Sequence, residues 1–400
     1  MRDLTEQVAA AVGALPAVDQ HCHTLVRDWS DLGDAGAPRW RHCFTEARRP
    51  RSLSADVPAS TGYRQFLRAM GTYLGETGGT RVDLEDRVVG RRAERLAADP
   101  EAYAHRLFDD AGVSALLVDT GFGPRPLATD VLERLVGRSV RTVVRVESIA
   151  EQCLGAAGRA SVTRIAFTDR LLEALEAAIA DGVVGFKTIA AYRAGLDLPE
   201  PSAARVAGAL RRLDRATQAR RLDDRTVIAH VVWTAARLGA VHGLPLQVHV
   251  GFGDEDVHLP TADPTLLRPL FRDPTTEACP VVLLHNHPYV DQAAYLASVY
   301  PQVLVDLSLS IPLLGEAGAG RAIASALALC PVSKLLAGSD GHSYPEMHWR
   351  GMRLWREALG RVLAAEVEAG RMDVAEVEPV ARSVLSANSE RVYGLAGASG

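Results

Sequence analysis

The chain contains almost no lysine. Of the 44 basic residues in its 400 positions, only Lys187 and Lys334 are lysines, and all the others are arginines. A position that keeps lysine in such a chain is expected to need an amine that can lose its proton, because arginine stays protonated in proteins. Lys187 directly follows an apolar run and is therefore a candidate for chemistry. Lys334 precedes a predicted strand and is expected to be a surface charge.

Cysteine and long hydrophobic runs are also scarce. No run of about 18 apolar residues occurs and the N-terminus has no long apolar segment, so neither a membrane span nor secretion is expected. The cysteines are odd in number and form no CxxC pair, which argues against a disulfide framework and a thiolate metal site. They are Cys22, Cys43, Cys153, Cys279 and Cys330. We expect a cytoplasmic protein.

The chain also lacks an excess of positive charge. Its formal net charge is -5, and its 48% of hydrophobic and 23% of charged residues are typical of a soluble globular protein. Without a basic stripe, neither nucleic acid nor an anionic membrane is an expected partner. The expected ligand is a small molecule, and a homo-oligomer stays open.

Apolar runs rich in Val, Leu and Ile recur along the chain, with helical patterns between them. Eight such runs predict a (β/α)8 barrel of parallel strands and helical crossovers. The runs cover residues 17–18, 113–118, 140–146, 183–186, 244–250, 281–284, 303–307 and 335–337. Residues 26–105, which include several aromatic residues, are far too many for a usual βα loop. We predict one domain over residues 1–400, with a helical insertion at 26–105.

Potential metal ligands follow these runs. His21 and His23 follow the first run, and because side chains alternate along a strand both should point the same way. His249, His285 and Asp340 follow the fifth, sixth and eighth runs, and the carboxyl ends of barrel strands face one cavity. A lone histidine at such a point is more often a hydrogen-bonded core group, but several in register favour ligands. Imidazole and carboxylate ligands predict one or two divalent ions, Zn or Mn.

Lys187 ends the fourth run, in Val-Val-Gly-Phe-Lys-Thr. A protonated lysine beside a cation would be repelled, so a functional lysine there must be neutral, distant, or carboxylated by carbon dioxide. The carboxylated form is anionic and has two oxygens that can bridge two ions. The alternative is a lysine that binds a carboxylate of the substrate.

Loop residues beyond the strands are candidates for substrate binding. Tyr192 and Arg193 follow the fourth strand, and the planar guanidinium of Arg193 could hold a substrate carboxylate in two parallel hydrogen bonds. The alternative for Arg193 is a salt bridge within the loop. His287 shares strand parity with His285, so either could be the ligand, and His342 lies two residues after Asp340. For His287 and His342 the alternative is a hydrogen-bonded loop residue.

Together these features resemble the amidohydrolase superfamily, and more closely its amidohydrolase-2 branch, typified by FluG and nodulin-type proteins. The resemblance covers nearly the whole chain. It rests on Val18-Asp-Gln-His-Cys-His, Phe44-Thr-Glu-Ala, Gly185-Phe-Lys-Thr-Ile-Ala-Ala-Tyr-Arg-Ala-Gly-Leu, His249-Val-Gly-Phe-Gly-Asp, Asp306-Leu-Ser-Leu-Ser-Ile-Pro, Gly338-Ser-Asp-Gly and Ala387-Asn-Ser-Glu-Arg-Val-Tyr-Gly-Leu.

The resemblance implies a distorted (β/α)8 barrel and assigns roles to the ligands. His21 and His23 would hold the more buried metal, His249 and His285 would lie on the exposed side, and Asp340 would be both ligand and proton shuttle. It favours His285 over His287 as the ligand. Members of this branch often keep a single metal, in which case Lys187 would have no second ion to bridge.

The expected activity is hydrolysis of an amide or other C–N bond of a small substrate, which would carry a carboxylate if Arg193 binds it. Water activated by the metal would attack, and Asp340 would move its proton to the leaving nitrogen. The alternative is a metal-dependent decarboxylase, a lyase of the same superfamily, which would release carbon dioxide. A non-catalytic sensing or scaffold protein is less expected, because it would tolerate loss of ligands and all six positions are filled.

Overall fold

The strands form one parallel sheet that is rolled into a barrel. The computed structural model describes residues 2–33, 38–47, 49, 52–122, 126–155, 163–215 and 221–395. Eight strands pair in sequence order, every adjacent pair parallel. They are β1 (Ala17–His23), β2 (Val113–Asp119), β3 (Ser139–Arg145), β4 (Gly185–Thr188), β5 (Leu246–Val250), β6 (Val281–His285), β7 (Val303–Asp306) and β8 (Leu335–Leu336). The predicted (β/α)8 barrel is confirmed.

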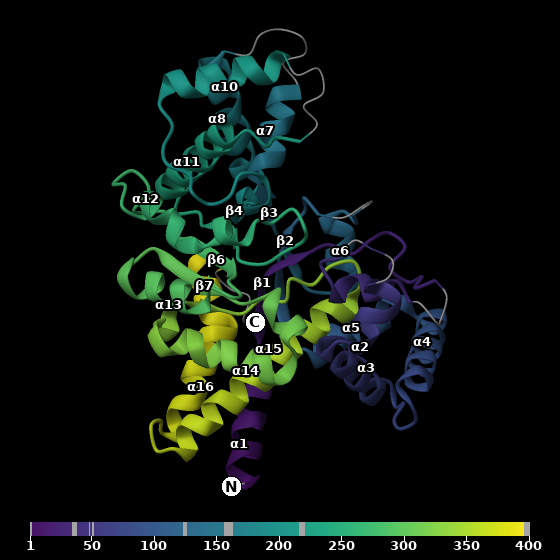
Figure 1. The fold of residues 1–400 in the computed structure, drawn as a ribbon. Coiled ribbons are helices and arrows are strands. Elements are labelled where there is room, and N and C mark those ends of the chain that lie inside the picture. Colours follow the sequence, from purple (N-terminus) through teal and green to yellow (C-terminus); the bar gives the residue numbers. More distant parts are fainter. Residues whose placement is uncertain are drawn as a thin grey trace.

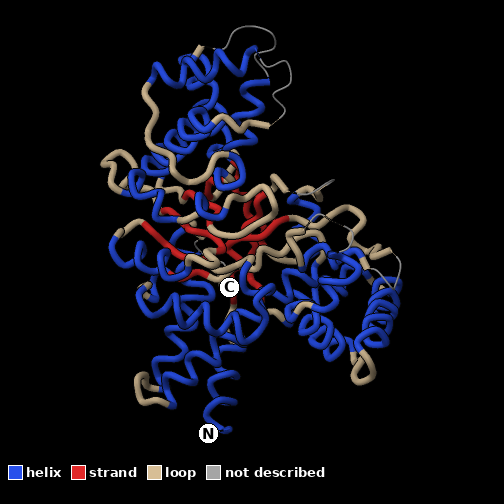
Figure 2. Tube along the Cα trace, in the orientation of Figure 1, coloured by secondary structure: helices blue, strands red, loops and turns tan. Residues whose placement is uncertain are grey.

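Helices enclose the strands on the outside, as Figure 2 shows. Those between β1 and β4 are η1 (Arg39–Phe44), η2 (Ser52–Asp56), α2 (Val57–Ala59), α3 (Thr61–Leu74), α4 (Arg81–Ala98), α5 (Pro100–Asp110), α6 (Thr129–Val136), α7 (Val146–Gly155) and α8 (Arg164–Ala180). Those between β4 and β8 are α9 (Ala190–Arg193), α10 (Ala203–Arg215), α11 (Arg225–His242), η3 (Leu259–Ala262), η4 (Pro264–Leu267), α12 (Arg268–Phe271), α13 (Val290–Val299), α14 (Ser310–Leu329) and η5 (Val332–Lys334). Before β1 lies α1 (Arg2–Gly13), and after β8 lie α15 (Pro345–Glu368), α16 (Val374–Arg382), η6 (Ser383–Ala387) and α17 (Asn388–Val392).

The first and last strands meet through backbone hydrogen bonds beyond the short β8. The amide of Gln20 donates to the carbonyl of Ala337 at 3.2 Å, and the amide of Asp340 donates to the carbonyl of His21 at 2.9 Å. The amide of His23 donates to the carbonyl of Gly341 at 2.8 Å. The barrel is therefore closed, and the end of β1 is fixed against the loop that follows β8.

A helical insertion separates β1 from β2. The four helices α2 to α5 lie together beside α14 and α15, at the right of Figure 1, and α5 ends at Asp110, five residues beyond the expected boundary at 105. Thr80 and Asp83 form a capping box that starts α4. Arg92 of α4 forms a buried ion pair with Glu346 of α15, and the close approach of α3 to α14 leaves no room for a side chain at Gly62.

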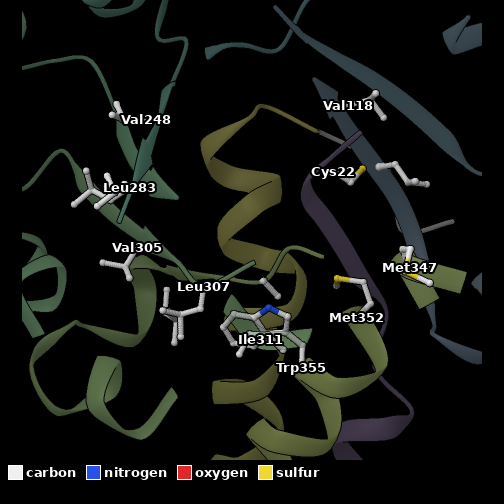
Figure 3. Close-up of a cluster of buried hydrophobic side chains, with 14 of the residues drawn as sticks. Cys22, Val118, Val248, Leu283, Val305, Leu307, Ile311, Met347, Met352 and Trp355 are labelled. Carbon is white, nitrogen blue, oxygen red and sulfur yellow. The ribbon is translucent and has the colours of Figure 1, made fainter. Parts of the chain in front are cut away.

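The apolar core has two parts. Between the barrel and the surrounding helices lies a large cluster, of which Figure 3 shows the region around Cys22, Leu307, Met352 and Trp355. A smaller cluster draws alternate residues from the strands, so it fills the inside of the barrel. It consists of Val18, Ala115, Leu117, Val143, Val282, Leu284, Leu304, Leu336, Val392, Tyr393 and Leu395. The chain segment after α17 thus contributes to the barrel interior.

In the described ranges, each helix is too short or too polar to pass through a lipid bilayer.

Candidate metal centre

A cavity of about 230 Å³ lies at the carboxyl ends of the strands. Most of the residues singled out in the sequence line it, although they come from different strands. These are His23, Lys187, Tyr192, Arg193, His249, His285, Asp340 and His342. His21 is fully buried next to them. The closed barrel therefore brings residues from both ends of the chain to one point.

Three of these side chains form a compact group. Nε2 of His21 lies 3.1 Å from Oδ1 of Asp340, and Nε2 of His23 lies 3.3 Å from the same oxygen. One potential ligand atom from each of the three residues lies within 4.8 Å of the other two. His21 and His23 share one side of β1, while Cys22 between them turns to the core outside the barrel (Figure 3).

The tautomers of the two imidazoles follow from their second ring nitrogens. Nδ1 of His21 lies 2.9 Å from Oε1 of Gln247, and Nδ1 of His23 lies 3.0 Å from the carbonyl oxygen of Asp119. Both partners only accept hydrogen bonds, so each Nδ1 carries the proton and each Nε2 presents a lone pair. The Oδ1 atom of Asp340 is buried and receives no hydrogen bond from the described residues. Three lone-pair donors thus converge, as a bound cation requires.

The protonation states of these side chains also favour a bound cation. Burial and the nearby Lys187 lower the pKa of His21 to about 4, so its ring is neutral at pH 7. Burial would raise the pKa of Asp340, but positive charge on the ring of His285 and protons donated by His21 and His23 hold it well below the usual carboxyl range, and a bound cation would supply the same stabilisation when the rings are neutral. Neutral imidazoles and an ionised carboxylate are the protonation states in which these groups bind divalent ions. The residues present therefore fit a metal.

His249 and His285 lie beside this group but are not part of its three-residue core. Their rings are 4.5 Å apart between centroids, and the ring of His285 is 5.3 Å from that of His21. Nε2 of His249 donates to the carbonyl oxygen of Phe252 at 3.2 Å, which leaves Nδ1 as its lone-pair nitrogen. Burial lowers the pKa of both histidines well below the ordinary value. Both are available as neutral ligands on the open side of the group.

The amine of Lys187 points toward the group formed by His21, His23 and Asp340. Its Nζ lies 3.1 Å from Nε2 of His21, the nitrogen that also faces Asp340. Burial lowers the pKa of Lys187 to about 8. In this unmodified form, the ammonium supplies the positive charge to which the lone pair of His21 points.

Strained backbone holds the two ends of the site. His285, Asn286 and Asp340 have φ values of 70°, 59° and 51°. Residues other than glycine rarely adopt this left-handed region. Such conformations cost about 1–3 kcal/mol each and cluster at functional sites. The Asp340 amide is held by the carbonyl of His21, and the His285 amide donates to Oδ1 of Asp306 at 3.1 Å. The hydrogen bonds of neighbouring strands therefore maintain the strain.

The predicted substrate-binding residues differ in their positions. Tyr192, on the single turn α9, packs its ring 4.3 Å from that of His249. Arg193 lines the cavity, but its Nη1 donates to Oε1 of Glu151 and to the carbonyl of Leu222, both at 2.9 Å. Its salt bridge reaches α7, outside its own loop. His342 lines the cavity, whereas His287 does not and packs edge-to-face on Phe252 instead.

The cavity lining also includes residues that the sequence reasoning did not assign to the site. Among them are Glu46 from the helical insertion, Phe122 beyond β2, Arg145 at the end of β3, and Arg221. The ring of Phe122 lies 4.6 Å from that of His23 and 5.1 Å from that of His342. Phe122 and Arg145 occur at or just after strand ends, the same signal that identified the histidines. Glu46 and Arg221 occur far from any strand end and carry no such signal.

A second compact group lies outside the barrel wall and consists of Asp19, Cys22 and His348. The carboxylate of Asp19 accepts hydrogen bonds from the amide and the hydroxyl of Ser339, at 2.8 and 2.5 Å. Nδ1 of His348 lies 3.4 Å from the same carboxylate. These hydrogen bonds anchor the loop that carries Asp340. We therefore interpret this second group as structural support for the candidate metal centre.

The fold and this cavity define a (β/α)8 barrel with histidines and an aspartate at the strand ends, the arrangement that the amidohydrolase resemblance implies. No protein-family model matches the chain. The chain is 27% identical over 407 aligned positions to the protein FluG of Emericella nidulans, an alignment that covers 95% of this chain and 46% of FluG. The chain thus spans about half the length of that relative.

Solved structures of other proteins are also similar to this chain. The chain is 28% identical to a candidate metal-dependent hydrolase from Lactobacillus casei ATCC 334, with a TM-score of 0.87 over 98% of this chain and 99% of that one. It also matches uronate isomerase from Thermotoga maritima with a TM-score of 0.72 and 13% identity, over 98% of this chain and 97% of that one. The second likeness extends to the fold alone. These similarities confirm the resemblance to the amidohydrolase superfamily, in the branch that contains FluG.

Proposed function

We propose that this protein is a metal-dependent hydrolase that cleaves an amide or other C–N bond of a small, carboxylate-bearing substrate. The observation that carries the proposal is the convergence of three lone-pair donors, Nε2 of His21, Nε2 of His23 and Oδ1 of Asp340, beside a cavity. Without a cation, these groups would repel one another in a buried site. The hydrolase from Lactobacillus casei, whose fold matches over nearly its whole length, supports the same class of activity.

A divalent ion, Zn or Mn, would be held by His21, His23 and Asp340, with His249 and His285 as further ligands on the open side. When bound, the ion would polarise the scissile carbonyl and lower the pKa of a water molecule toward about 7. Asp340 would accept a proton from the attacking water and deliver it to the leaving nitrogen. Its ionised state and its position at the cavity wall support this role.

The role of Lys187 depends on the number of ions. An ammonium 3.1 Å from Nε2 of His21 competes with a cation for that lone pair, whereas a carboxylated Lys187 would be an anionic ligand. We propose that Lys187 is carboxylated where two ions are bound and unmodified where one is bound. Two ions per chain with an intact mass raised by carbon dioxide would support the first state. One ion with the plain mass would support the second.

Tyr192, Arg193 and His342 would contact the substrate. Nη1 of Arg193 is already engaged by Glu151 and Leu222, so the other nitrogens of its fork would bind the carboxylate. A substrate role for His287 stays a prediction, and it is not supported by the cavity lining, which does not include His287.

The test is metal analysis followed by product analysis. Protein purified without chelator should contain at least one Zn or Mn per chain, and His23→Ala should lose it while the matched variant His105→Ala, at a histidine outside the cavity, keeps it. The loaded enzyme should release ammonia or an amine from a panel of N-acyl amino acids. Release of carbon dioxide would identify the decarboxylase alternative. Absence of metal, with no response to added Zn or Mn, would exclude a metalloenzyme.

A further inference from the structure

Two residues in segments that carry the family resemblance lie outside the cavity lining. Asp306 begins Asp-Leu-Ser-Leu-Ser-Ile-Pro at the end of β7 and is completely buried. Tyr393 belongs to the segment Ala387-Asn-Ser-Glu-Arg-Val-Tyr-Gly-Leu, near the end of the described chain, and is 5% exposed. Neither residue lines the cavity. Both are nevertheless connected to its histidines.

A continuous chain of hydrogen bonds joins Asp306 to His21 through the barrel interior. Gln20 Nε2 donates to Oδ2 of Asp306 at 2.8 Å, and the hydroxyl of Tyr393 donates to Oε1 of Gln20 at 2.7 Å. Gln247 Nε2 donates to the hydroxyl oxygen of Tyr393 at 2.7 Å. Oε1 of Gln247 then accepts from Nδ1 of His21 at 2.9 Å. All five side chains are buried.

Two groups that only accept hydrogen bonds fix the directions in this chain: the ionised carboxylate of Asp306 and the backbone carbonyl of Gln20. Gln20 must turn its NH2 group to Asp306 and its oxygen to the hydroxyl of Tyr393. Gln247 Nε2 donates to the carbonyl oxygen of Gln20 at 2.9 Å as well as to the hydroxyl oxygen of Tyr393. With its NH2 group held by these two acceptors, Gln247 turns its oxygen to His21. The proton of His21 therefore resides on Nδ1, and Nε2 is left bare.

A shorter branch reaches the second histidine. The hydroxyl of Ser308 donates to Oδ1 of Asp306 at 2.6 Å, so its oxygen can accept from Nδ1 of His285, 2.9 Å away. The amide of Leu309 only donates, and it donates to the same nitrogen at 3.3 Å, so these two contacts favour opposite tautomers of His285. Asp306 thus orders a hydrogen-bonding partner of His285, whereas the proton position is fixed only for His21.

We propose that Gln247 is a positioning residue that fixes the tautomer of His21 for metal binding, and that the carbonyl of Gln20 and the hydroxyl of Tyr393 hold its amide in that orientation. This inference rests on the proposed function, because a bare Nε2 matters only where it meets a cation. Groups that orient ligating histidines typically change metal affinity or activity by about 10- to 100-fold when they are removed.

The test is Gln247→Leu, which removes the acceptor at Nδ1 of His21. Long-range 1H–15N NMR of the metal-free, 15N-histidine-labelled protein reports the tautomer of His21, whose signals are identified by their loss in His21→Gln. We expect the Nδ1–H form to fall in population and Zn affinity, measured by competition with a chromogenic chelator, to weaken about tenfold.

Gln302→Leu is the matched control, because it also removes one buried amide, which donates to the carbonyl of Phe271 at 2.8 Å, outside the chain of bonds. It should leave the His21 tautomer and the Zn affinity unchanged. If Gln247→Leu behaves like this control and only lowers the melting temperature, Gln247 is merely structural and the proposal is overturned.

Gln247→Met, with an unbranched side chain of similar length, provides a second variant should Gln247→Leu fail to fold, since it also removes the acceptor at Nδ1. An unchanged His21 tautomer in Gln247→Met would also overturn the proposal. Wild-type protein that binds neither Zn nor Mn would instead count against the proposed function. The NMR tautomer would still decide whether the chain of hydrogen bonds sets the proton.

Discussion

Asp340 combines a strained backbone, a buried charge and a position between two imidazoles. Its φ of 51° is maintained by the hydrogen bond from its amide to His21, and the preceding Ser339 is held by Asp19. Asparagine tolerates this left-handed conformation better than most residues. Asp340→Asn should therefore keep the backbone and remove only the negative charge.

For Asp340→Asn we expect kcat to fall by about 10²- to 10⁴-fold, because a general acid–base group is lost, while part of the metal is retained through the histidines. Steady-state kinetics and elemental analysis on the same preparation measure both effects. The surface variant Asp130→Asn should change neither. A variant at Asp340 that kept its metal and near-normal kcat would remove this residue from the proton transfer.

The ion pair between Arg193 and Glu151 allows a test that separates substrate binding from support of the loop. Arg193→Lys should raise KM for a carboxylate substrate about tenfold or more, since lysine cannot form two parallel hydrogen bonds. Glu151→Gln breaks the same ion pair and leaves the guanidinium in place. If both variants lower the melting temperature and neither raises KM, Arg193 only supports the loop.

Residues of the candidate site were predictable where they occur at strand ends, since the barrel itself makes those positions neighbours. The hydrogen-bonded partners of the histidines were not. Gln20, Gln247 and Tyr393 lie within strands or after a C-terminal helix, and nothing in their local sequence indicates that their side chains meet inside the barrel. Their pairing depends on the register of distant segments, which appears only when the sheet closes.

At the level of elements, most strands were predictable because strands covered on both faces read as continuous apolar runs. The first run covered only residues 17–18, and β1 continues from there through polar residues to His23. Their ends were less certain. The third apolar run was expected to extend through Val146. In the structure β3 ends at Arg145, and Val146 is the first residue of α7, where its side chain is buried. An apolar run does not distinguish a buried strand from the buried first turn of the helix that follows.

The anchoring of α4 to α15 gives a prediction for stability. Arg92 is almost completely buried, pairs with Glu346, and donates to the carbonyls of Ser30 and Trp29 at 2.9 and 2.8 Å. Removing one partner of a buried pair leaves an uncompensated charge, so Glu346→Gln should lower the free energy of unfolding by about 3–5 kcal/mol. Urea denaturation measures the change.

The control for this prediction is Arg134→Gln, which breaks an exposed pair with Asp130 within α6. It should leave the urea midpoint unchanged, because exposed pairs contribute little. Equal midpoints for Glu346→Gln and the wild type would mean that the insertion does not depend on this contact.

For the whole molecule, a metal held by residues of β1 and of the loop after β8 should stabilise the closed barrel. An ion that binds only the folded chain, at a free concentration 100 times its Kd, adds about 2.7 kcal/mol. For a chain of this size, that corresponds to a rise in Tm of about 3 °C. Calorimetry with Zn or Mn against a chelator should show this rise, and His23→Ala should abolish it. An equal rise in that variant would place the ion elsewhere.

The backbone hydrogen bonds between β1 and the segment after β8 also bear on synthesis. His21 and His23 are translated early, but Asp340, which lies against them, is made more than three hundred positions later, and Tyr393 later still. A nascent chain cannot assemble the histidine–carboxylate group until residue 340 has left the ribosome. A divalent ion could therefore meet the complete group only after residue 340 has been made, and an ion supplied to a shorter ribosome-bound fragment would meet two histidines without their carboxylate.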